Sequence, residues 1–460
     1  MTISPLSNDT IAAIATAPGR AAVAVLRVSG PGARQVLARV SPSFSARARV
    51  QRLTAIHHPE TGELLDRALV TLFPAPASYT GEDTVEISTH GGTLTPQLVL
   101  GALLAAGARA ALPGEFTRRA YLNGKLDLLQ AEAVADLIDG RSPALHRAAV
   151  HQMERGLSRR VDELRAAIIQ AESLIAYSID FPEEDEPPVP PSRVRAPALD
   201  ITRRMDALLA TAPEGELLRE GALTVLAGRP NSGKSSLFNA LLGTERAIVT
   251  EIPGTTRDAL EASVTVDGYP FRLVDTAGLR DTADRVEGIG IEVARRYLSA
   301  ADLVLFCVEA GRGLGDDERS FLAERDPVRT LLVRTRSDLA EAGSSNGDGA
   351  SADGMRSVAV AAVEGRGMSE LRLALLGMAF GHILGEPGEA PLVTRERHAR
   401  ALRHARDEVA AFVDALDADV PMELAATHLR AAAGELEDLI GAVSVDDVLD
   451  RVFGDFCVGK

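Results

Sequence analysis

Eight residues, from Gly228 to Ser235, have the composition and spacing of a phosphate-binding loop. They read GRPNSGKS and match the pattern G-x-x-x-x-G-K-[ST]. An apolar run at 223–227 predicts a buried strand before the loop, and 235–242 predict a helix after it. The glycines allow successive backbone N–H groups to point at a polyphosphate beside the helix N-terminus. A glycine-rich turn without a ligand is the alternative, and the flanking strand and helix disfavour it. The phosphate contacts that we assign are Asn231, Ser232, Gly233, Lys234, Ser235 and Ser236, with Lys234 as a catalytic cation and Ser235 as a Mg²⁺ ligand.

Two later segments have the residues of a nucleotide-dependent switch. Asp275 follows a predicted strand, where a carboxylate can hold the Mg²⁺ shell, and the Gly278 backbone N–H would meet the γ-phosphate. A threonine between the two motifs can ligate Mg²⁺ only when the γ-phosphate is present, and Thr256 is our candidate. The segments assigned to the nucleotide are Thr250, Glu251, Ile252, Pro253, Gly254, Thr255 and Thr256, and Asp275, Thr276, Ala277 and Gly278.

The predicted base-binding loops depart from the usual guanine pattern Asn-Lys-x-Asp. Asp338 can accept hydrogen bonds from the guanine N1–H and exocyclic amine, which adenine lacks, and the Arg336 stem can stack on the base. A second loop can offer backbone N–H groups to the guanine O6. We therefore expect GTP rather than ATP as substrate. The residues assigned to the base are Thr335, Arg336, Ser337 and Asp338, and then Ala361, Ala362 and Val363.

The residue that orients the attacking water is less obvious. Leu279 stands where many GTPases have a glutamine, and an apolar side chain cannot position a nucleophile. Glu287 lies in the same segment and could act through a bridging water. A solvated loop glutamate is the alternative reading of Glu287.

Charge and composition limit the remaining functions. The net charge of −16 argues against a wide basic surface for nucleic acid. Only three of the 49 basic residues are lysines, namely Lys125, Lys234 and Lys460. A compact ammonium suits a tight pocket better than a guanidinium does, so Lys125 and Lys460 are candidate ligand residues. The alternative is that both are ordinary surface lysines retained by chance.

The cysteine content and the hydropathy indicate a cytoplasmic protein. Cys307 and Cys457 are too few for a disulfide framework, and Cys307 lies in a predicted core strand. We find no signal peptide and no apolar run of about 20 residues, so we expect no membrane association.

The element pattern predicts a multidomain α+β protein. Short strands at 11–15, 22–28, 68–73 and 84–88, with helices at 33–40 and 96–106, form a small α/β N-terminal domain. A long amphipathic run at 142–179 and further runs after 394 are helical and flank the alternating strands and helices of 221–380. The economical topology is a discontinuous all-helical domain with a P-loop α/β GTPase domain inserted. The predicted boundaries are 1–121, 122–220, 221–381 and 382–460.

The whole pattern resembles the tRNA-modification GTPases called MnmE or TrmE. The resemblance covers nearly the full chain and includes the segments 9–16, 113–117, 122–128 and 131–136, the GTPase motifs and the ending FCVGK. It implies an N-terminal domain that binds formyl-tetrahydrofolate through Arg27, Glu86, Lys125 and Lys460, and a homodimer formed through that domain. It also implies a flavin-dependent MnmG-type partner, a heterotetramer with that partner, and the wobble uridine of certain tRNAs as the target.

The same resemblance implies further roles in hydrolysis. A K⁺ ion would be held by Asn231, Thr250, Ile252 and Thr255, and Glu287 matches the family's water-orienting glutamate. Cys457 matches a C-terminal cysteine near the transferred one-carbon unit, although a buried structural thiol is also possible. The competing function is a GTPase switch in RNA or ribosome assembly without modification chemistry, which the folate residues disfavour. A phosphotransferase conflicts with the switch threonines and with Asp338.

Overall fold

The computed structural model describes residues 9–45, 47–180, 190–244, 261–275, 287–339, 355–385, 393–441, 449, 452–454 and 456–459. The chain divides into two compact units, each with its own sheet. The first unit contains Met1–Ala135 together with Glu437–Lys460, and the second contains Asp136–Leu436. The C-terminal residues therefore belong to the same unit as the N-terminal domain. No described helix has both the length and the apolar content needed to cross a membrane.

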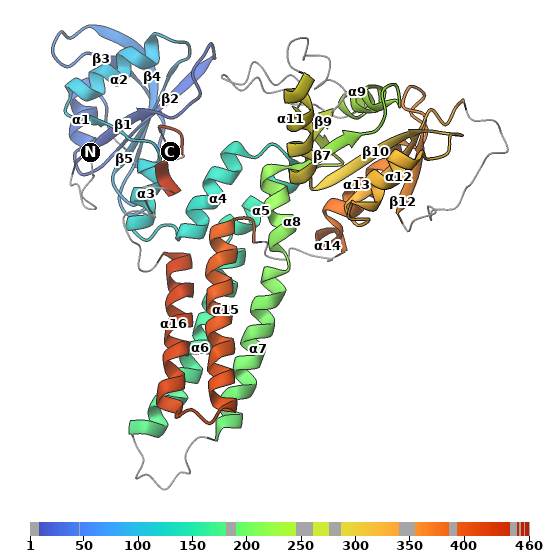
Figure 1. The fold of residues 1–460 in the computed structure, drawn as a ribbon. Helices are drawn as coiled ribbons and strands as arrows, with labels where there is room; N and C mark the ends of the chain where they lie inside the picture. The colour runs from blue at the N-terminus through green and yellow to red at the C-terminus, as the bar shows by residue number, and fades with distance from the viewer. Residues whose placement is uncertain are drawn as a thin grey trace. The chain divides into compact units, whose positions relative to one another are not determined.

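The first unit is built on a six-stranded sheet in the order β3-β4-β5-β2-β1-β6. Apart from the parallel β1–β6 pair, neighbouring strands are antiparallel. Leu26 and Val28 on β2 and Val85 and Ile87 on β5 contribute to the core beneath α1 and α2. The strands are β1 Ile11–Ile14, β2 Val23–Ser29, β3 Arg52–His57, β4 Leu64–Phe73, β5 Thr84–His90 and β6 Arg109–Ala110. The helices of this unit are α1 Ala33–Val40, α2 Thr95–Ala105 and α3 Glu115–Leu122, and α4 Leu128–Asp139 begins in it and ends in the second unit (Figure 1).

A partly buried ion-pair network joins Asp9, just before β1, to helix α3. Arg119 donates to both Asp9 Oδ1 (2.6 Å) and Glu115 Oε1 (2.9 Å), and Arg109 donates to Asp9 and Glu115 as well. Burial raises the pKa of the Glu115 carboxyl, but hydrogen bonds from Arg109, the Leu112 backbone N–H and Arg119 outweigh it and hold that pKa below its usual value.

The helices of the second unit include a bundle formed by α6, α7, α15 and α16 (Figure 1). The expected single run at 142–179 is wrong. It is two helices, because Arg155 has a left-handed φ of 64° that interrupts the helical backbone. Ser142 caps the first of them by accepting a hydrogen bond from the Leu145 N–H (3.1 Å). The helices are α5 Pro143–Met153, α6 Gly156–Asp180, α7 Pro191–Leu209, α8 Ala212–Glu220, α15 Glu396–Asp417 and α16 Met422–Ile440.

The second sheet has the order β12-β11-β10-β7-β9-β8 and is parallel except for the edge strand β8. Its central strands β7 and β10 are mostly apolar and are buried along nearly their whole length, as expected for strands covered by helices on both faces. The strands are β7 Ala222–Ala227, β8 Glu261–Val266, β9 Tyr269–Asp275, β10 Leu303–Glu309, β11 Thr330–Thr335 and β12 Arg356–Val360. The helices are α9 Lys234–Thr244, α11 Glu287–Ala300, α12 Asp316–Ala323, α13 Met368–Ala379 and α14 Gly381–Gly385.

The chain enters and leaves this α/β region at one place. Glu214 on α8, just before β7, accepts hydrogen bonds from the backbone N–H groups of His382 (2.8 Å) and Ile383 (2.6 Å) at the start of α14. The Thr211 hydroxyl accepts a further bond from the Val393 N–H (3.0 Å). The inserted arrangement expected from the order of helices and strands is thus present in the second unit.

Candidate nucleotide and cofactor sites

The phosphate-binding loop lies between β7 and α9, as the sequence predicts. Its backbone takes left-handed φ values at Gly228 (138°), Asn231 (62°) and Gly233 (83°), the curl that turns N–H groups inward. A Cβ on Gly228 would lie 2.4 Å from the Cys307 carbonyl oxygen, so only glycine fits there. The loop therefore has the backbone conformation that phosphate binding requires.

Two polar side chains of this loop, those of Lys234 and Ser235, make hydrogen bonds at the carboxyl edge of the sheet. Lys234 is only 4% exposed, and its Nζ donates to the carbonyl oxygens of Gly228 (3.0 Å) and Arg229 (2.6 Å). Ser235 Oγ donates to Asp275 Oδ2 (2.9 Å), and Asp275 is 6% exposed at the end of β9. A hydroxyl and a buried carboxylate at hydrogen-bond distance form an oxygen donor set that suits Mg²⁺. Ser235 and Asp275, predicted from separate motifs, are thus brought together.

The base-binding residues follow β11 beside the phosphate loop. Thr335 is 3% exposed, and its hydroxyl donates to the Ser232 carbonyl oxygen (2.7 Å) and makes a longer contact with the Val308 carbonyl (3.3 Å). The Ser337 N–H donates to the Val360 carbonyl (3.2 Å). Thr335 thereby joins the loop of residues 335–338 to the phosphate loop. The sequence pattern did not predict this contact.

The loop after β12 has a closed turn at the predicted O6 site. The Ala361 N–H donates to the Arg366 carbonyl (3.0 Å), and the Glu364 N–H donates to the Ala361 carbonyl (3.1 Å). Val363 at the tip is 93% exposed. The predicted nucleotide contacts of Ala361, Ala362 and Val363 remain predictions.

Several predicted residues lie outside the described part of the chain. They are Thr250, Glu251, Ile252, Pro253, Gly254, Thr255, Thr256, Thr276, Ala277, Gly278 and Lys460. Glu287 is the first residue of α11, and the orientation of its side chain is not described. Asn231 is therefore the described member of the predicted K⁺ ligands.

Arg27 and Glu86, the first two predicted folate residues, contact each other across β2 and β5. The Arg27 Nε and Nη2 atoms donate to Glu86 Oε1 at 3.1 and 2.9 Å. The guanidinium lies 5.3 Å from the ring centroid of Tyr79 and 5.7 Å from that of Phe116. Its Nη1 atom is buried and has no protein partner. The sequence analysis did not identify Tyr79 or Phe116 as neighbours of Arg27, although Phe116 lies inside the segment 113–117 on which the resemblance rests.

Lys125 and the C-terminal segment lie in the same unit as Arg27. Lys125 Nζ donates to the Pro76 carbonyl (3.1 Å), in the loop that leads to Tyr79. Gly459 packs against the backbone of Ile14 and Ala15, where a Cβ would lie 2.5 Å from the Ile14 oxygen. Because β1 pairs with β2, the residue before Lys460 is placed one strand away from Arg27.

The two cysteines differ in environment. Cys307 is fully buried, and burial raises the pKa of its thiol to about 12, so it is a core residue as predicted. Cys457 is exposed, and its carbonyl accepts a hydrogen bond from the Gly114 N–H (3.4 Å). The reading of Cys457 as a buried structural thiol is therefore wrong.

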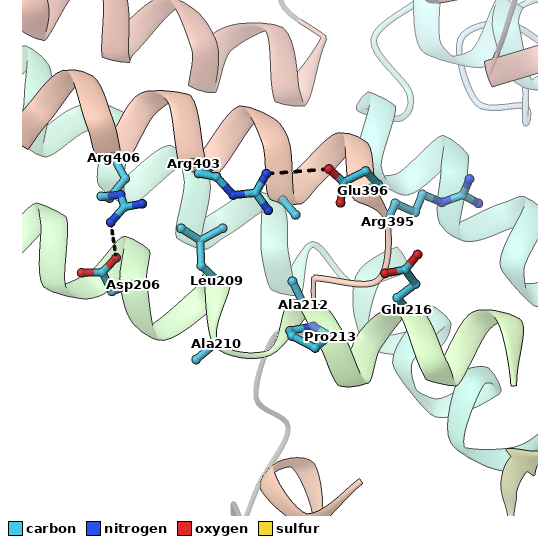
Figure 2. A pocket seen from close by; sticks show the side chains of 11 residues that line it. Asp206, Leu209, Ala210, Ala212, Pro213, Glu216, Arg395, Glu396, Arg403 and Arg406 are labelled. Atoms are coloured by element: carbon cyan, nitrogen blue, oxygen red, sulfur yellow. Dashed lines mark ion pairs between the residues drawn. The ribbon is translucent and has the colours of Figure 1, made fainter. Parts of the chain in front are cut away.

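A hollow of about 460 Å³ lies elsewhere, among α7, α8 and the first half of α15 (Figure 2). Its arginines face carboxylates: Arg406 pairs with Asp206 (3.4 Å), and Arg403 pairs with Glu396 (3.7 Å). None of the residues assigned to the nucleotide or to folate lines it.

The strand–loop–helix with Lys234, Ser235 and Asp275 on a mostly parallel sheet defines a P-loop nucleotide-binding protein of the GTPase class. The family model for the GTP-binding protein TrmE N-terminus matches residues 10–125, and the model for the MnmE helical domain matches residues 128–457. The tRNA modification GTPase MnmE of Moorella thermoacetica is 42% identical, over 98% of this chain and 100% of that protein. The tRNA modification GTPase MnmE of Ralstonia nicotianae is 43% identical, over 99% of this chain and 98% of that protein. The chain therefore belongs to the MnmE family of tRNA modification GTPases.

Proposed function

We propose that this chain is a K⁺-dependent GTP hydrolase that modifies tRNA with a one-carbon unit from formyl-tetrahydrofolate. Together with a flavin-dependent MnmG-type partner, it would add an aminomethyl or carboxymethylaminomethyl group to carbon 5 of the wobble uridine of certain tRNAs. The partner would supply the redox chemistry, and the folate would supply the carbon when bound.

The buried, unpartnered Nη1 atom of Arg27 is the observation that carries the folate assignment. A buried cationic donor without an acceptor is costly, and a ligand with anionic or carbonyl oxygens would satisfy it. Glu86 holds the guanidinium from one side, and Tyr79 and Phe116 flank it. Arg27, Lys125 and Lys460 would hold anionic groups of the folate, and Glu86 would accept hydrogen bonds from the pterin edge.

For GTP hydrolysis, Lys234 and Mg²⁺ held by Ser235, Thr256 and Asp275 would neutralise the phosphates. K⁺ held by Asn231, Thr250, Ile252 and Thr255 would add positive charge where other GTPases use an arginine finger. Glu287 would orient the attacking water.

Exposed leucines on the first sheet support pairing of two copies through the N-terminal domain. Leu53 on the edge strand β3 is 64% exposed, and Leu64 and Leu69 on β4 are 51% and 40% exposed. Exposed apolar side chains grouped on an edge strand and on the strand next to it are typical of an interface. We propose a cytoplasmic homodimer that forms a heterotetramer with the MnmG-type partner.

Folate binding by the full-length protein tests the assignment. The wild type should bind 5-formyltetrahydrofolate in a calorimetric titration, and Lys125→Ala should bind it at least about tenfold more weakly, as expected for loss of a charged hydrogen bond. Arg49→Ala is a matched control, because Arg49 donates to the Ala77 carbonyl (3.0 Å) in the same loop but has no assigned folate role. A wild type that does not bind, or an equal loss in both variants, contradicts the assignment.

The rate of GTP hydrolysis in K⁺ and in Na⁺ tests the second metal. We expect faster hydrolysis in K⁺ and a reduced difference between the ions in Asn231→Ala. Equal rates in both salts would contradict the proposed K⁺ dependence, but they would not contradict GTP hydrolysis itself.

A further inference from the structure

Glu309 and Arg336 meet where two parallel strands end. The register of β10 and β11 places Glu309 opposite Thr335, so Arg336 follows directly at the carboxyl edge. Arg336 Nη1 donates to Glu309 Oε1 (2.9 Å). In open α/β sheets, ligands bind outside the carboxyl ends of the strands, which places this pair on the nucleotide side.

The backbone around Arg336 is held in an unusual conformation. Arg336 has a left-handed φ of 52°, which side chains with a Cβ rarely adopt. The loop is braced by hydrogen bonds from the Ala310 N–H to the Thr335 carbonyl (2.7 Å) and from the Leu339 N–H to the Arg336 carbonyl (3.1 Å). Such strain persists only where the surroundings determine it, and it is concentrated at functional sites.

The chemistry of the pair suggests orientation rather than stability as its role. The side chains are 44% and 41% exposed, and exposed ion pairs contribute little to folding. A guanidinium is planar, so a carboxylate bound at one edge fixes its plane and leaves its face free to stack on a flat ring. A lysine at this position would present no such face.

We propose that Glu309 is a positioning residue of the base subsite, which holds the Arg336 guanidinium plane against the purine of the bound guanine nucleotide. This inference rests on the guanine-nucleotide binding assigned above. It adds Glu309, which lies outside every assigned motif, and it gives Arg336 a defined task. Stacking does not depend on the exocyclic amine, so the pair serves guanine and hypoxanthine equally, whereas Asp338 would discriminate between them.

The test is calorimetric titration of the full-length protein with GDP and with IDP. Glu309→Gln keeps the size of the side chain but removes its charge, and it should weaken the binding of both nucleotides by the same factor, about three- to fivefold. Glu261→Gln is the matched control, because Glu261 pairs with Arg272 (3.3 Å) at the far edge of the same sheet, with similar exposure of 32% and 35%. It should bind both nucleotides as the wild type does.

A double-mutant comparison separates positioning from a general structural effect. Arg336→Ala should lose at least as much affinity as Glu309→Gln, and adding Glu309→Gln to Arg336→Ala should cause no further loss. In steady-state hydrolysis, Glu309→Gln should raise the KM for GTP and leave kcat unchanged.

Three results would overturn the inference: unchanged GDP and IDP affinity in Glu309→Gln, a loss confined to GDP, or additive losses in the double variant. A wild type that binds no guanine nucleotide would instead overturn the nucleotide function itself. The two failures are therefore distinguishable.

Discussion

The contact between Thr335 and the phosphate loop gives a quantitative prediction for nucleotide affinity. Thr335→Val keeps the shape of the side chain but removes the hydroxyl that donates to the Ser232 carbonyl at 2.7 Å. Thr335 is 3% exposed and Ser232 is 5% exposed, so water cannot easily replace the lost donor. An unsatisfied buried carbonyl of this kind costs about 1–2 kcal/mol.

Because the phosphate loop must keep its curled form to bind phosphates, we expect this cost to appear in nucleotide affinity. It corresponds to GDP binding that is about five- to thirtyfold weaker. Thr335→Ser is the matched control, since it keeps the hydroxyl and loses only a methyl group, and its affinity should stay within about threefold of the wild type. The assay is calorimetric titration with GDP, which suits a chain that has no tryptophan.

Wild-type affinity in Thr335→Val would show that the hydrogen bond does not hold the phosphate loop. An equal loss in Thr335→Ser would assign the effect to packing instead. Either result refutes the argument from the hydroxyl.

Three further predictions concern backbone contacts and pH. In Gly114→Ala, the new Cβ would lie 2.4 Å from the Phe453 carbonyl at a left-handed φ, so proteolysis should remove the C-terminal segment faster than in the wild type. In Gly367→Ala, a Cβ 2.0 Å from the Ala359 carbonyl should shift the loop after β12, which contains Ala361, and should weaken GDP binding by about tenfold or more, as measured by titration. Glu115 has a lowered pKa in the folded state, so its stabilisation is present above the ordinary carboxyl pKa and is lost as pH falls through the folded value. Urea unfolding followed by circular dichroism should therefore show the advantage of wild type over Glu115→Gln at pH 7 shrinking below about pH 4; an advantage that does not change with pH would refute this.

The sequence predicted the fold best where its pattern was strongest. The strand and helix around the phosphate loop and the apolar central strands were predicted correctly, because complete burial leaves a continuous apolar signal. Strand β3 was missed because its side chains are mostly exposed or half-exposed, and β6 was missed because it has only two residues. The break at Arg155 was missed because the left-handed residue is an arginine, whereas glycine is the usual signal for such a conformation.

The candidate sites show a similar limit. Motif spacing brought Ser235 and Asp275 together correctly, because the phosphate loop follows β7 and Asp275 ends the neighbouring parallel strand β9 at the same edge of the sheet. The ion pair of Arg27 with Glu86 could not be derived from pattern alone, since a charge in a strand usually faces water. Glu309 was missed because an acidic residue at the end of an apolar strand has no motif of its own, and only the strand register shows its neighbour.

The bonds from Glu214 to His382 and Ile383 have a consequence for how this chain can be divided. The Glu214 carboxylate accepts hydrogen bonds from N–H groups in the first turn of α14. The segment that leads into the α/β region is thereby bonded directly to the segment that leads out of it. An inserted domain whose two ends lie close together in this way can be removed or replaced with little change in the structure of the host domain. The second unit therefore offers natural cut points on either side of residues 221–380 for producing the two parts as separate polypeptides.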